Sequence, residues 1–301
     1  MRGTKPATLA NLSLILTLLT ACAPTVSHTD SPAPLEAPTK NPTQQTETSP
    51  IAPPEANSTL PALDSAPANP LPAGALTIVT LGDSLTAGDG DETGQGGYPP
   101  RLLQLIETRR PGSQVINLGH SGWTSGDVIT GVNGEPSELR PALEAKPQLA
   151  LVWIGSNDLW YLYEYGPDPI TEEAEQQDLA RYEANLDTIL RELTNAGAMV
   201  YLALLDDQSK RPVVANPPNP AEPAFTATNA DDLAHMSAHV SAYNEILQHV
   251  ALKYGATPVD FYHTTIFTDP VSLYSDGNHP NPTGYDQITQ IWFSAIEPAL
   301  K

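Results

Sequence analysis

Basic residues and cysteines are scarce in this chain of 301 residues. It holds 14 Lys and Arg against 35 Asp and Glu, which gives a formal net charge of −21. Nucleic-acid binding needs Lys and Arg for contacts to phosphates, so this balance argues against nucleic acid as a partner. The balance also disfavours attraction to anionic lipid headgroups. The single cysteine, Cys22, excludes an intramolecular disulfide and a cysteine-based zinc site.

Aromatic residues are missing from residues 23–75, which hold 12 of the 31 prolines of the chain. Pro, Thr, Ser, Ala, Asn and Gln dominate there, and the apolar surface is too small to offset the entropy of folding. We therefore expect a disordered, semi-stiff tether over residues 22–75 and a folded domain over residues 76–301, which contain every Phe, Tyr and Trp. A proline-rich ligand for a partner domain is the alternative interpretation of the tether.

The N-terminal segment indicates export. Arg2 and Lys5 precede a mostly apolar run that is too short to span a membrane and is typical of a secretory signal. The sequence LTAC at residues 19–22 resembles a bacterial lipoprotein signal. This resemblance implies a signal peptide over residues 1–21, lipidation of Cys22 and anchoring to a membrane of the cell envelope, facing the periplasm or the exterior. An ordinary signal peptide, or a weak anchor helix, with an incidental cysteine is the alternative.

Short apolar runs alternate with longer helical patterns across residues 76–301. The apolar runs predict strands at residues 76–81, 115–118, 149–154, 199–205 and 257–261. The helical patterns lie near residues 101–110, 172–194, 231–253 and 283–296. Strands that are apolar throughout and separated by helices predict an α/β domain with a parallel sheet buried on both faces.

Polar motifs follow four of these five strands, at residues 82–88, 117–122, 155–158 and 276–280. In an open α/β sheet, ligands bind outside the carboxyl ends of the strands, so the motifs are expected at one edge. Ser84 lies between glycines directly after the first strand and can present its hydroxyl at a helix N-terminus. The same pattern also fits a serine that only caps a helix.

The motifs resemble, in order, signature blocks of the SGNH (GDSL-type) hydrolase family. The matching segments are Gly82-Asp83-Ser84-Leu85, Gly122-Trp123-Thr124, Gly155-Ser156-Asn157-Asp158 and Asp276-Gly277-Asn278-His279. Each block alone is a weak signal, whereas four in order are specific. The resemblance implies a three-layer α/β/α sandwich around a flavodoxin-like, five-stranded parallel sheet. It also implies hydrolysis of carboxylic esters with no cofactor and no metal.

The resemblance assigns a role to each matched residue. Ser84 becomes the nucleophile, His279 the base that takes and returns its proton, and Asp276 the residue that orients His279. The oxyanion would be bound by the backbone N–H groups of Ser84 and Gly122 and by the side-chain amide of Asn157. Judged without the resemblance, Asn157 and Asp276 are also acceptable as turn or cap residues, and His279 as a loop histidine bonded to backbone.

Two residues depart from the family pattern. Trp123 lies where many relatives carry a small or acidic residue, and it either walls the acyl pocket or packs under its loop. Ser156 replaces a common glycine and could shift the neighbouring Asn157 slightly. Neither departure removes a catalytic atom.

Two further patterns resemble metal sites, but each lacks a glutamate that the complete pattern requires. Residues 89–94 resemble the start of a calcium loop, but Pro100 stands where the bidentate glutamate is needed. His235 and His239 are four residues apart on a predicted helix, but Met236 stands where the metalloprotease pattern has its glutamate. We favour a flexible acidic loop and a solvated helix face, respectively.

The substrate is the least determined part of the prediction. The family cleaves small-acyl, lysophospholipid-like and acetylated-sugar esters, and we expect a monomer that acts on such a small-molecule ester. The loop at residues 206–229 is expected to border the pocket as a partial lid. The aromatic run at residues 160–165 either lines the site or packs the sheet edge. Two alternatives remain, an O-acyltransferase of the cell envelope and a non-catalytic envelope-binding lipoprotein on the same fold.

Overall fold

A computed structural model describes residues 70–167, 169–216 and 230–301. The expected signal peptide, Cys22 and most of the expected tether lie outside the described residues. Packed contacts begin before residue 76, because Leu71 is buried and its N–H donates to the carbonyl oxygen of Ala299 at 2.9 Å. Within the described ranges, no helix combines the length and the apolar character that a membrane span requires.

The centre of the domain is a parallel sheet in the strand order β2-β1-β3-β4-β5. The strands are β1 (Thr77–Gly82), β2 (Gln114–Asn117), β3 (Leu149–Trp153), β4 (Met199–Ala203) and β5 (Thr257–Val259). All five predicted strands are therefore confirmed. β4 ends two residues before its predicted end, because the N–H of Leu205 donates to the side chain of Asn244 at 2.8 Å instead of to a strand.

The register explains why the inner strands are so apolar. In the middle of the sheet, Leu151 of β3 lies between Thr80 of β1 and Tyr201 of β4, and all three are fully buried. A parallel strand is buried on both faces because its connections place helices on both sides of the sheet. The predicted parallel, doubly covered sheet is confirmed.

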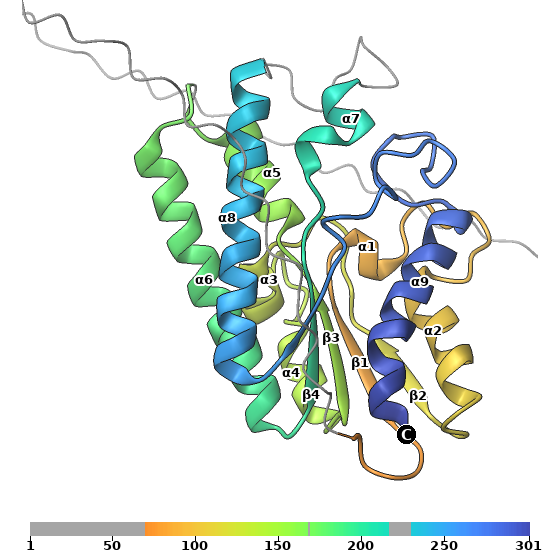
Figure 1. The fold of residues 1–301 in the computed structure, drawn as a ribbon. Helices are drawn as coiled ribbons and strands as arrows, with labels where there is room; N and C mark the ends of the chain where they lie inside the picture. The colour runs from red at the N-terminus through yellow and green to blue at the C-terminus, as the bar shows by residue number, and fades with distance from the viewer. Residues whose placement is uncertain (1–69, 168, 217–229) are drawn as a thin grey trace, which may run out of the picture. The chain divides into compact units, whose positions relative to one another are not determined.

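Helices form the two outer layers (Figure 1). The helices are α1 (Ser84–Ala87), α2 (Tyr98–Glu107), α3 (Ser125–Thr130), α4 (Leu139–Glu144), α5 (Ser156–Tyr165), α6 (Glu172–Asn195), α7 (Pro212–Ala215), α8 (Ala230–Tyr254) and α9 (Pro282–Ile296), with 3-10 turns η1 (Gln208–Lys210) and η2 (Glu297–Leu300). In Figure 1, α6 and α8 pack together on one side of the sheet, and α2 and α9 pack together on the other. The predicted three-layer α/β/α sandwich is confirmed.

The four predicted helices are present as α2, α6, α8 and α9. The bounds of α6, α8 and α9 lie within one residue of the prediction, whereas α2 begins and ends three residues earlier than predicted. Pro99 and Pro100 occupy its first turn, where the amide groups have no partner within the helix and proline is accepted. The other helices, α1, α3, α4, α5 and α7, were not predicted. Most of them span one or two turns next to polar motifs, so they present no sustained apolar period.

An aromatic cluster lies under the carboxyl end of β3. Trp153 is fully buried, and its ring stacks on Phe261 with a centroid distance of 4.2 Å. Trp292 of α9 meets Trp153 edge-on at 6.1 Å, and Tyr98 of α2 lies 6.0 Å from it. This packing fixes the strand end from which the segment Gly155–Asp158 continues.

Candidate active site

Ser84 is the first residue of α1 and follows β1 directly. Asp83 caps this helix, since its Oδ1 accepts a hydrogen bond from the N–H of Leu85 at 3.0 Å. Burial raises the pKa of Asp83 to about 6. Gly82 passes so close to β3 that a Cβ there would lie 2.2 Å from the carbonyl oxygen of Trp153. The cap and the glycine hold the Ser84 hydroxyl at the carboxyl edge of the sheet.

The structure connects Ser84, His279 and Asp276 by a chain of hydrogen bonds. His279 Nε2 lies 3.0 Å from Ser84 Oγ, and His279 Nδ1 lies 2.6 Å from Asp276 Oδ2. The other carboxylate oxygen, Asp276 Oδ1, accepts hydrogen bonds from the N–H groups of Asn278 and His279 at 2.9 and 3.0 Å. The nucleophile–base–carboxylate order predicted from the sequence is therefore present as geometry.

Hydrogen bonds keep the carboxyl group of Asp276 ionised. Burial by itself would raise its pKa, but the hydrogen bonds from His279 and from the two backbone N–H groups outweigh burial and lower it. An ionised Asp276 accepts from Nδ1–H of His279 and leaves Nε2 free to accept the proton of Ser84. The arrangement can thus remove a proton from the serine hydroxyl.

Arg211 braces the loop that carries Asp276 and His279. It is 2% exposed, and it donates to both carboxylate oxygens of Asp206, at 2.8 Å from Nε and 2.6 Å from Nη2. Its Nη1 donates to Asn278 Oδ1 at 2.7 Å, and its guanidinium lies 4.5 Å from the centroid of Phe267. A buried arginine with this many fixed partners is rigid, so it holds Asn278 between the two predicted catalytic residues.

Gly122 and Asn157, the two predicted oxyanion donors outside the nucleophile segment, are connected through Trp123. Asn157 Nδ2 donates one hydrogen to the carbonyl oxygen of Trp123 at 2.8 Å, which leaves its second hydrogen for another acceptor. Gly122 has φ +81°, a left-handed conformation that favours glycine, and a Cβ there would meet nothing within 4 Å. The backbone at Gly122 therefore faces open space.

Trp123 packs under its loop, which is one of its two predicted roles. The side chain is buried, and its ring stacks on His120 with a centroid distance of 4.1 Å. The other departure, Ser156, is buried as the first residue of α5, and its Oγ has no hydrogen-bond partner among the described residues.

The acidic loop at residues 89–94 is organised around an arginine. Asp91 receives hydrogen bonds from Arg101 at 2.5 and 3.2 Å and from the hydroxyl of Thr93 at 2.6 Å. Burial opposes ionisation of Asp91, but the hydrogen bonds from Arg101 and Thr93 hold its pKa well below its usual range. The loop borders the catalytic loop, because a Cβ on Gly90 would lie 2.9 Å from the Cβ of His279.

His235 and His239 of α8 contact two different carboxylates of α6. His239 is buried with its Nε2 3.0 Å from Asp178 Oδ2, whereas His235 Nδ1 lies 3.2 Å from Glu175 Oε1. His239 is therefore an interior residue, and the expected solvated face applies only to His235. In the part of the chain that the structure describes, no group of three or more His, Cys, Asp and Glu side chains is placed to hold a metal ion.

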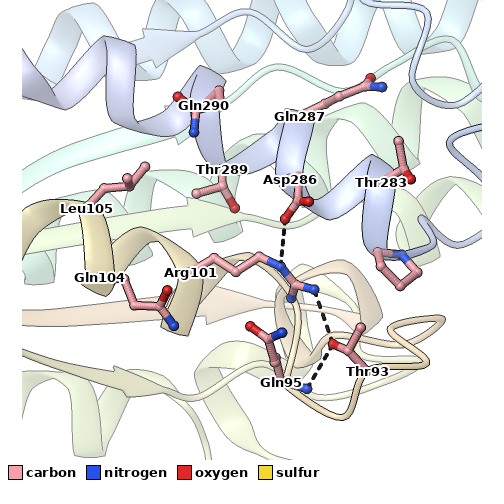
Figure 2. A pocket seen from close by; sticks show the side chains of 11 residues that line it. Thr93, Gln95, Arg101, Gln104, Leu105, Thr283, Asp286, Gln287, Thr289 and Gln290 are labelled. Carbon is pink, nitrogen blue, oxygen red and sulfur yellow. Dashed lines mark hydrogen bonds and ion pairs between the residues drawn. The ribbon is translucent and has the colours of Figure 1, made fainter.

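A separate cavity of about 570 Å³ opens between α2, α9 and the loop that precedes α2 (Figure 2). Arg101 lies in it and donates to Asp286 at 3.0 Å and to Thr93 at 3.3 Å. The lining residues are Thr93, Gln95, Arg101, Gln104, Leu105, Pro282, Thr283, Asp286, Gln287, Thr289 and Gln290. Because this lining includes none of the three residues of the catalytic line, the cavity is distinct from the candidate active site.

The aromatic run at residues 160–165 lies in α5. Tyr161 and Tyr165 are 49% and 68% exposed, with ring centroids 5.5 Å apart. Trp160 is half-buried and donates to Gln208 of η1 at 2.5 Å, and Tyr163 donates to Glu175 at 2.8 Å. Of the expected lid, residues 206–216 are described and include Arg211, whereas residues 217–229 lie outside the described residues.

Two buried residues with ionisable side chains, both close to the site, were missed by the sequence analysis. Arg211 precedes the four-residue helix α7, and Glu138 precedes the six-residue helix α4. Neither belongs to a motif. The only sequence signal for Arg211 was its place in a long segment after β4, and Glu138 gave none.

The comparisons with known proteins concern the family and the fold. A model of the GDSL-like lipase/acylhydrolase family matches residues 80–287. A multidomain esterase of Ruminococcus flavefaciens is 26% identical over an alignment of 271 positions, which covers 81% of this chain and 31% of that protein. The chain therefore spans about a third of the length of this curated relative.

Solved structures show the same fold. The acetylxylan esterase Axe2 of Geobacillus stearothermophilus is 20% identical, with a TM-score of 0.51 over 74% of this chain and 95% of that one. The structure of TesA is 20% identical, with a TM-score of 0.53 over 74% of this chain and 99% of that one. The family match runs from within β1 into α9 and so includes all the segments that meet at the site. The chain belongs to the GDSL-like lipase/acylhydrolase (SGNH) family.

Proposed function

We propose that this protein hydrolyses short-acyl carboxylic esters through a covalent acyl-enzyme on Ser84. The observation that carries the proposal is the contact of Ser84 Oγ with His279 Nε2 at 3.0 Å, backed by the contact of His279 Nδ1 with Asp276 at 2.6 Å. These distances lie within the hydrogen-bond reach that a nucleophile and its base require.

The reaction takes place in two halves. Ser84 Oγ forms a bond to the acyl carbon while its proton passes to His279 Nε2, and the carbonyl π electrons move onto the oxygen. When the carbonyl re-forms, the bond to the alcohol oxygen breaks, and His279 returns the proton to the leaving alcohol. Water then attacks the acyl-serine by the same route and releases the acid and the free serine. Asp276 stays ionised throughout and stabilises the imidazolium.

The negative charge on the former carbonyl oxygen needs donors that are fixed before the reaction. The backbone N–H groups of Ser84 and Gly122 and the second hydrogen of the Asn157 amide are the donors in this proposal. The hydrogen bond from Asn157 to Trp123 supports it, because it fixes the amide plane in advance. The exposure of Gly122 supports access of the substrate to this part of the loop.

For the alcohol part of the substrate, we favour an acetylated sugar over a lysophospholipid. One solved relative is named an acetylxylan esterase and the curated relative a multidomain esterase. The net charge of −21 also opposes the approach of an anionic lipid headgroup.

A panel of p-nitrophenyl esters of increasing acyl length tests the activity, with acetylated xylan and a lysophospholipid as natural-type substrates. The wild type should be most active on acetyl and propionyl esters, and Ser84→Ala should lose nearly all turnover while it keeps the Tm of the wild type. Unchanged turnover of Ser84→Ala would overturn the mechanism. Product that forms only when an acceptor sugar is added would instead identify an O-acyltransferase.

We also propose that Cys22 carries the lipid anchor and that the domain faces the periplasm or the exterior of a bacterial cell. The sequence LTAC at residues 19–22 supports this location. In a bacterial expression host, the wild type should fractionate with membranes, and Cys22→Ser should become soluble or remain unprocessed. Equal membrane association of both proteins would refute the anchor without affecting the esterase proposal.

A further inference from the structure

We propose that Glu138 is a positioning residue of this esterase: its buried carboxyl group fixes the end of the nucleophile strand against the loop that carries Gly122. The inference deepens the proposed function and rests on it for its effect on activity. It arises from a carboxyl group that no sequence motif contains and that the catalytic steps do not use.

The first contact of Glu138 is with the nucleophile segment. Glu138 precedes α4 and is 1% exposed, and its Oε2 accepts a hydrogen bond from the N–H of Gly82 at 2.9 Å. Gly82 is the last residue of β1 and lies two residues before Ser84. The backbone N–H at this strand end is satisfied by a side chain from another layer, so the position of Glu138 sets the position of the turn.

The second contact is with the oxyanion loop. The other oxygen, Glu138 Oε1, is buried and lies 3.5 Å from His120 Nδ1, without a hydrogen-bond partner among the described residues. The ring of His120 stacks on Trp123, and the carbonyl oxygen of Trp123 accepts the amide hydrogen of Asn157. A single side chain thus touches the strand end behind Ser84 and the loop that leads to Gly122 and Asn157.

The carboxyl group of Glu138 is protonated, which suits its position close to the site where the oxyanion forms. Burial raises the pKa of Glu138 to about 9, the negative charges of Asp83 and Asp127 add to the increase, and the hydrogen bond from Gly82 opposes it. The other titratable groups that face it are His120 and Tyr98. Glu138 is therefore neutral near pH 7, and it places no negative charge next to the oxyanion that forms in the reaction.

Ionisation of Glu138 should therefore inhibit the reaction. A purely structural role does not require this pH dependence of activity, so measuring it tests the positioning role. Glu138→Gln keeps the acceptor for Gly82 and the size of the side chain, but it cannot ionise. We expect its kcat near pH 7 to stay within about threefold of the wild type. Above about pH 9, kcat/KM of the wild type should fall by about tenfold, and Glu138→Gln should lack this fall.

Glu138→Leu removes the acceptor and leaves the N–H of Gly82 without its partner. We expect kcat to fall by about 100-fold with a change of KM below about threefold, because the displaced donors act mainly in the transition state. Glu144→Leu is the matched control, since Glu144 is an exposed residue on the same helix, and its activity should be unchanged. Circular dichroism shows whether Glu138→Leu folds; if it does not, the comparison of Glu138→Gln with the wild type still decides.

A stability measurement tests the buried neutral carboxyl group without any substrate. The folded pKa of Glu138 lies above its ordinary value of 4.5, so folding takes up a proton between about pH 4.5 and pH 9. The contribution of Glu138 to the free energy of unfolding is complete below pH 4.5 and is lost as the pH rises toward 9. The Tm of Glu138→Gln relative to the wild type should therefore increase steadily from about pH 5 to about pH 9.

The outcomes separate the two proposals. If Ser84→Ala is as active as the wild type, the esterase mechanism fails, while the Tm comparison still reports on Glu138. If Ser84→Ala is inactive, but the wild type and Glu138→Gln share the same alkaline decrease in kcat/KM, the positioning role is wrong. Rates are corrected for background hydrolysis of the ester with Ser84→Ala at each pH.

Discussion

Two segments of this protein contain an aspartate and a histidine three residues apart, and they fold into nearly the same local structure. In Asp260–His263, the Nδ1–Oδ2 distance is 2.7 Å and the histidine N–H donates to Oδ1 at 3.1 Å. In Asp276–His279, the corresponding distances are 2.6 and 3.0 Å. The spacing alone therefore produces an oriented Asp–His pair.

The two pairs differ in what lies beyond the histidine. Nε2 of His279 lies 3.0 Å from Ser84 Oγ, which is 195 residues earlier in the chain. His263 is 49% exposed, and its ring meets the edge of Tyr262. The candidate catalytic centre therefore differs from the surface Asp–His pair by the serine that the fold places next to its histidine, and not by the pair itself.

Removing each histidine gives the largest expected contrast. His279→Ala deletes the base, and kcat/KM should fall by about 10⁴–10⁶-fold, as is usual when a member of such a triad is lost. His263→Ala removes an exposed ring that contacts no nucleophile, and kcat/KM should stay within about twofold of the wild type. Steady-state kinetics on p-nitrophenyl acetate measure both. Similar losses in the two variants would show that the comparison has no functional meaning.

Replacing each carboxylate by an amide tests the orienting role. Asp276→Asn can present an N–H to His279 and favour the wrong tautomer, so kcat should fall by about 10⁴-fold. Asp260→Asn is the matched control and should leave kcat unchanged. A retained kcat in Asp276→Asn would mean that His279 is held by other contacts.

Sequence and structure agree best where a pattern is local. The inner strands were predicted because a strand buried on both faces is apolar at nearly every position, and the Asp276–His279 pair was predicted from a resemblance to a short family motif. The resemblance to a family, rather than the spacing, distinguished this pair from Asp260–His263. The long helices carried a sustained apolar period, whereas α1, α3, α4 and α7 are too short to show one.

The supporting residues could not be predicted, because their partners are fixed by tertiary packing. Glu138 is next to a short helix and reaches Gly82, 56 residues earlier in the chain. Arg211 reaches Asn278, 67 residues later. Without the fold, an isolated glutamate or arginine in a polar segment is indistinguishable from a solvated surface residue.

The proposed oxyanion donors are a further difference between the two pairs, because they lie only near Asp276–His279. Asn157→Ala should lower kcat by about 10²–10³-fold, or about 3–4 kcal/mol of transition-state stabilisation, with little change of KM. It also leaves the carbonyl oxygen of Trp123 without its donor. Asn185→Ala is the control, because Asn185 donates to Ser125 from the neighbouring helix α6 and should leave kcat nearly unchanged. A normal kcat with a raised KM in Asn157→Ala would assign Asn157 to ground-state binding.

The smallest effect concerns the residues between the aspartate and the histidine, Gly277-Asn278 in one pair and Phe261-Tyr262 in the other. Asn278 accepts from Arg211 at 2.7 Å, and its Nδ2 lies 3.5 Å from His279 Nε2. Asn278→Ala should lower kcat by about tenfold, because the catalytic loop loses its brace and the donor of a buried arginine loses its partner.

Asn278→Asp separates these two contributions. Its carboxylate keeps an acceptor for Arg211 but has no amide hydrogen to direct at His279. If the brace is what matters, Asn278→Asp should recover most of the kcat lost in Asn278→Ala, and its Tm should return to that of the wild type. If the amide next to His279 Nε2 matters instead, Asn278→Asp should recover the Tm and leave kcat low. If Asn278→Ala itself keeps the kcat and Tm of the wild type, Arg211 acts through Asp206 and Phe267 alone, and the Asp276–His279 pair, like its copy at Asp260–His263, is held by its own hydrogen bonds.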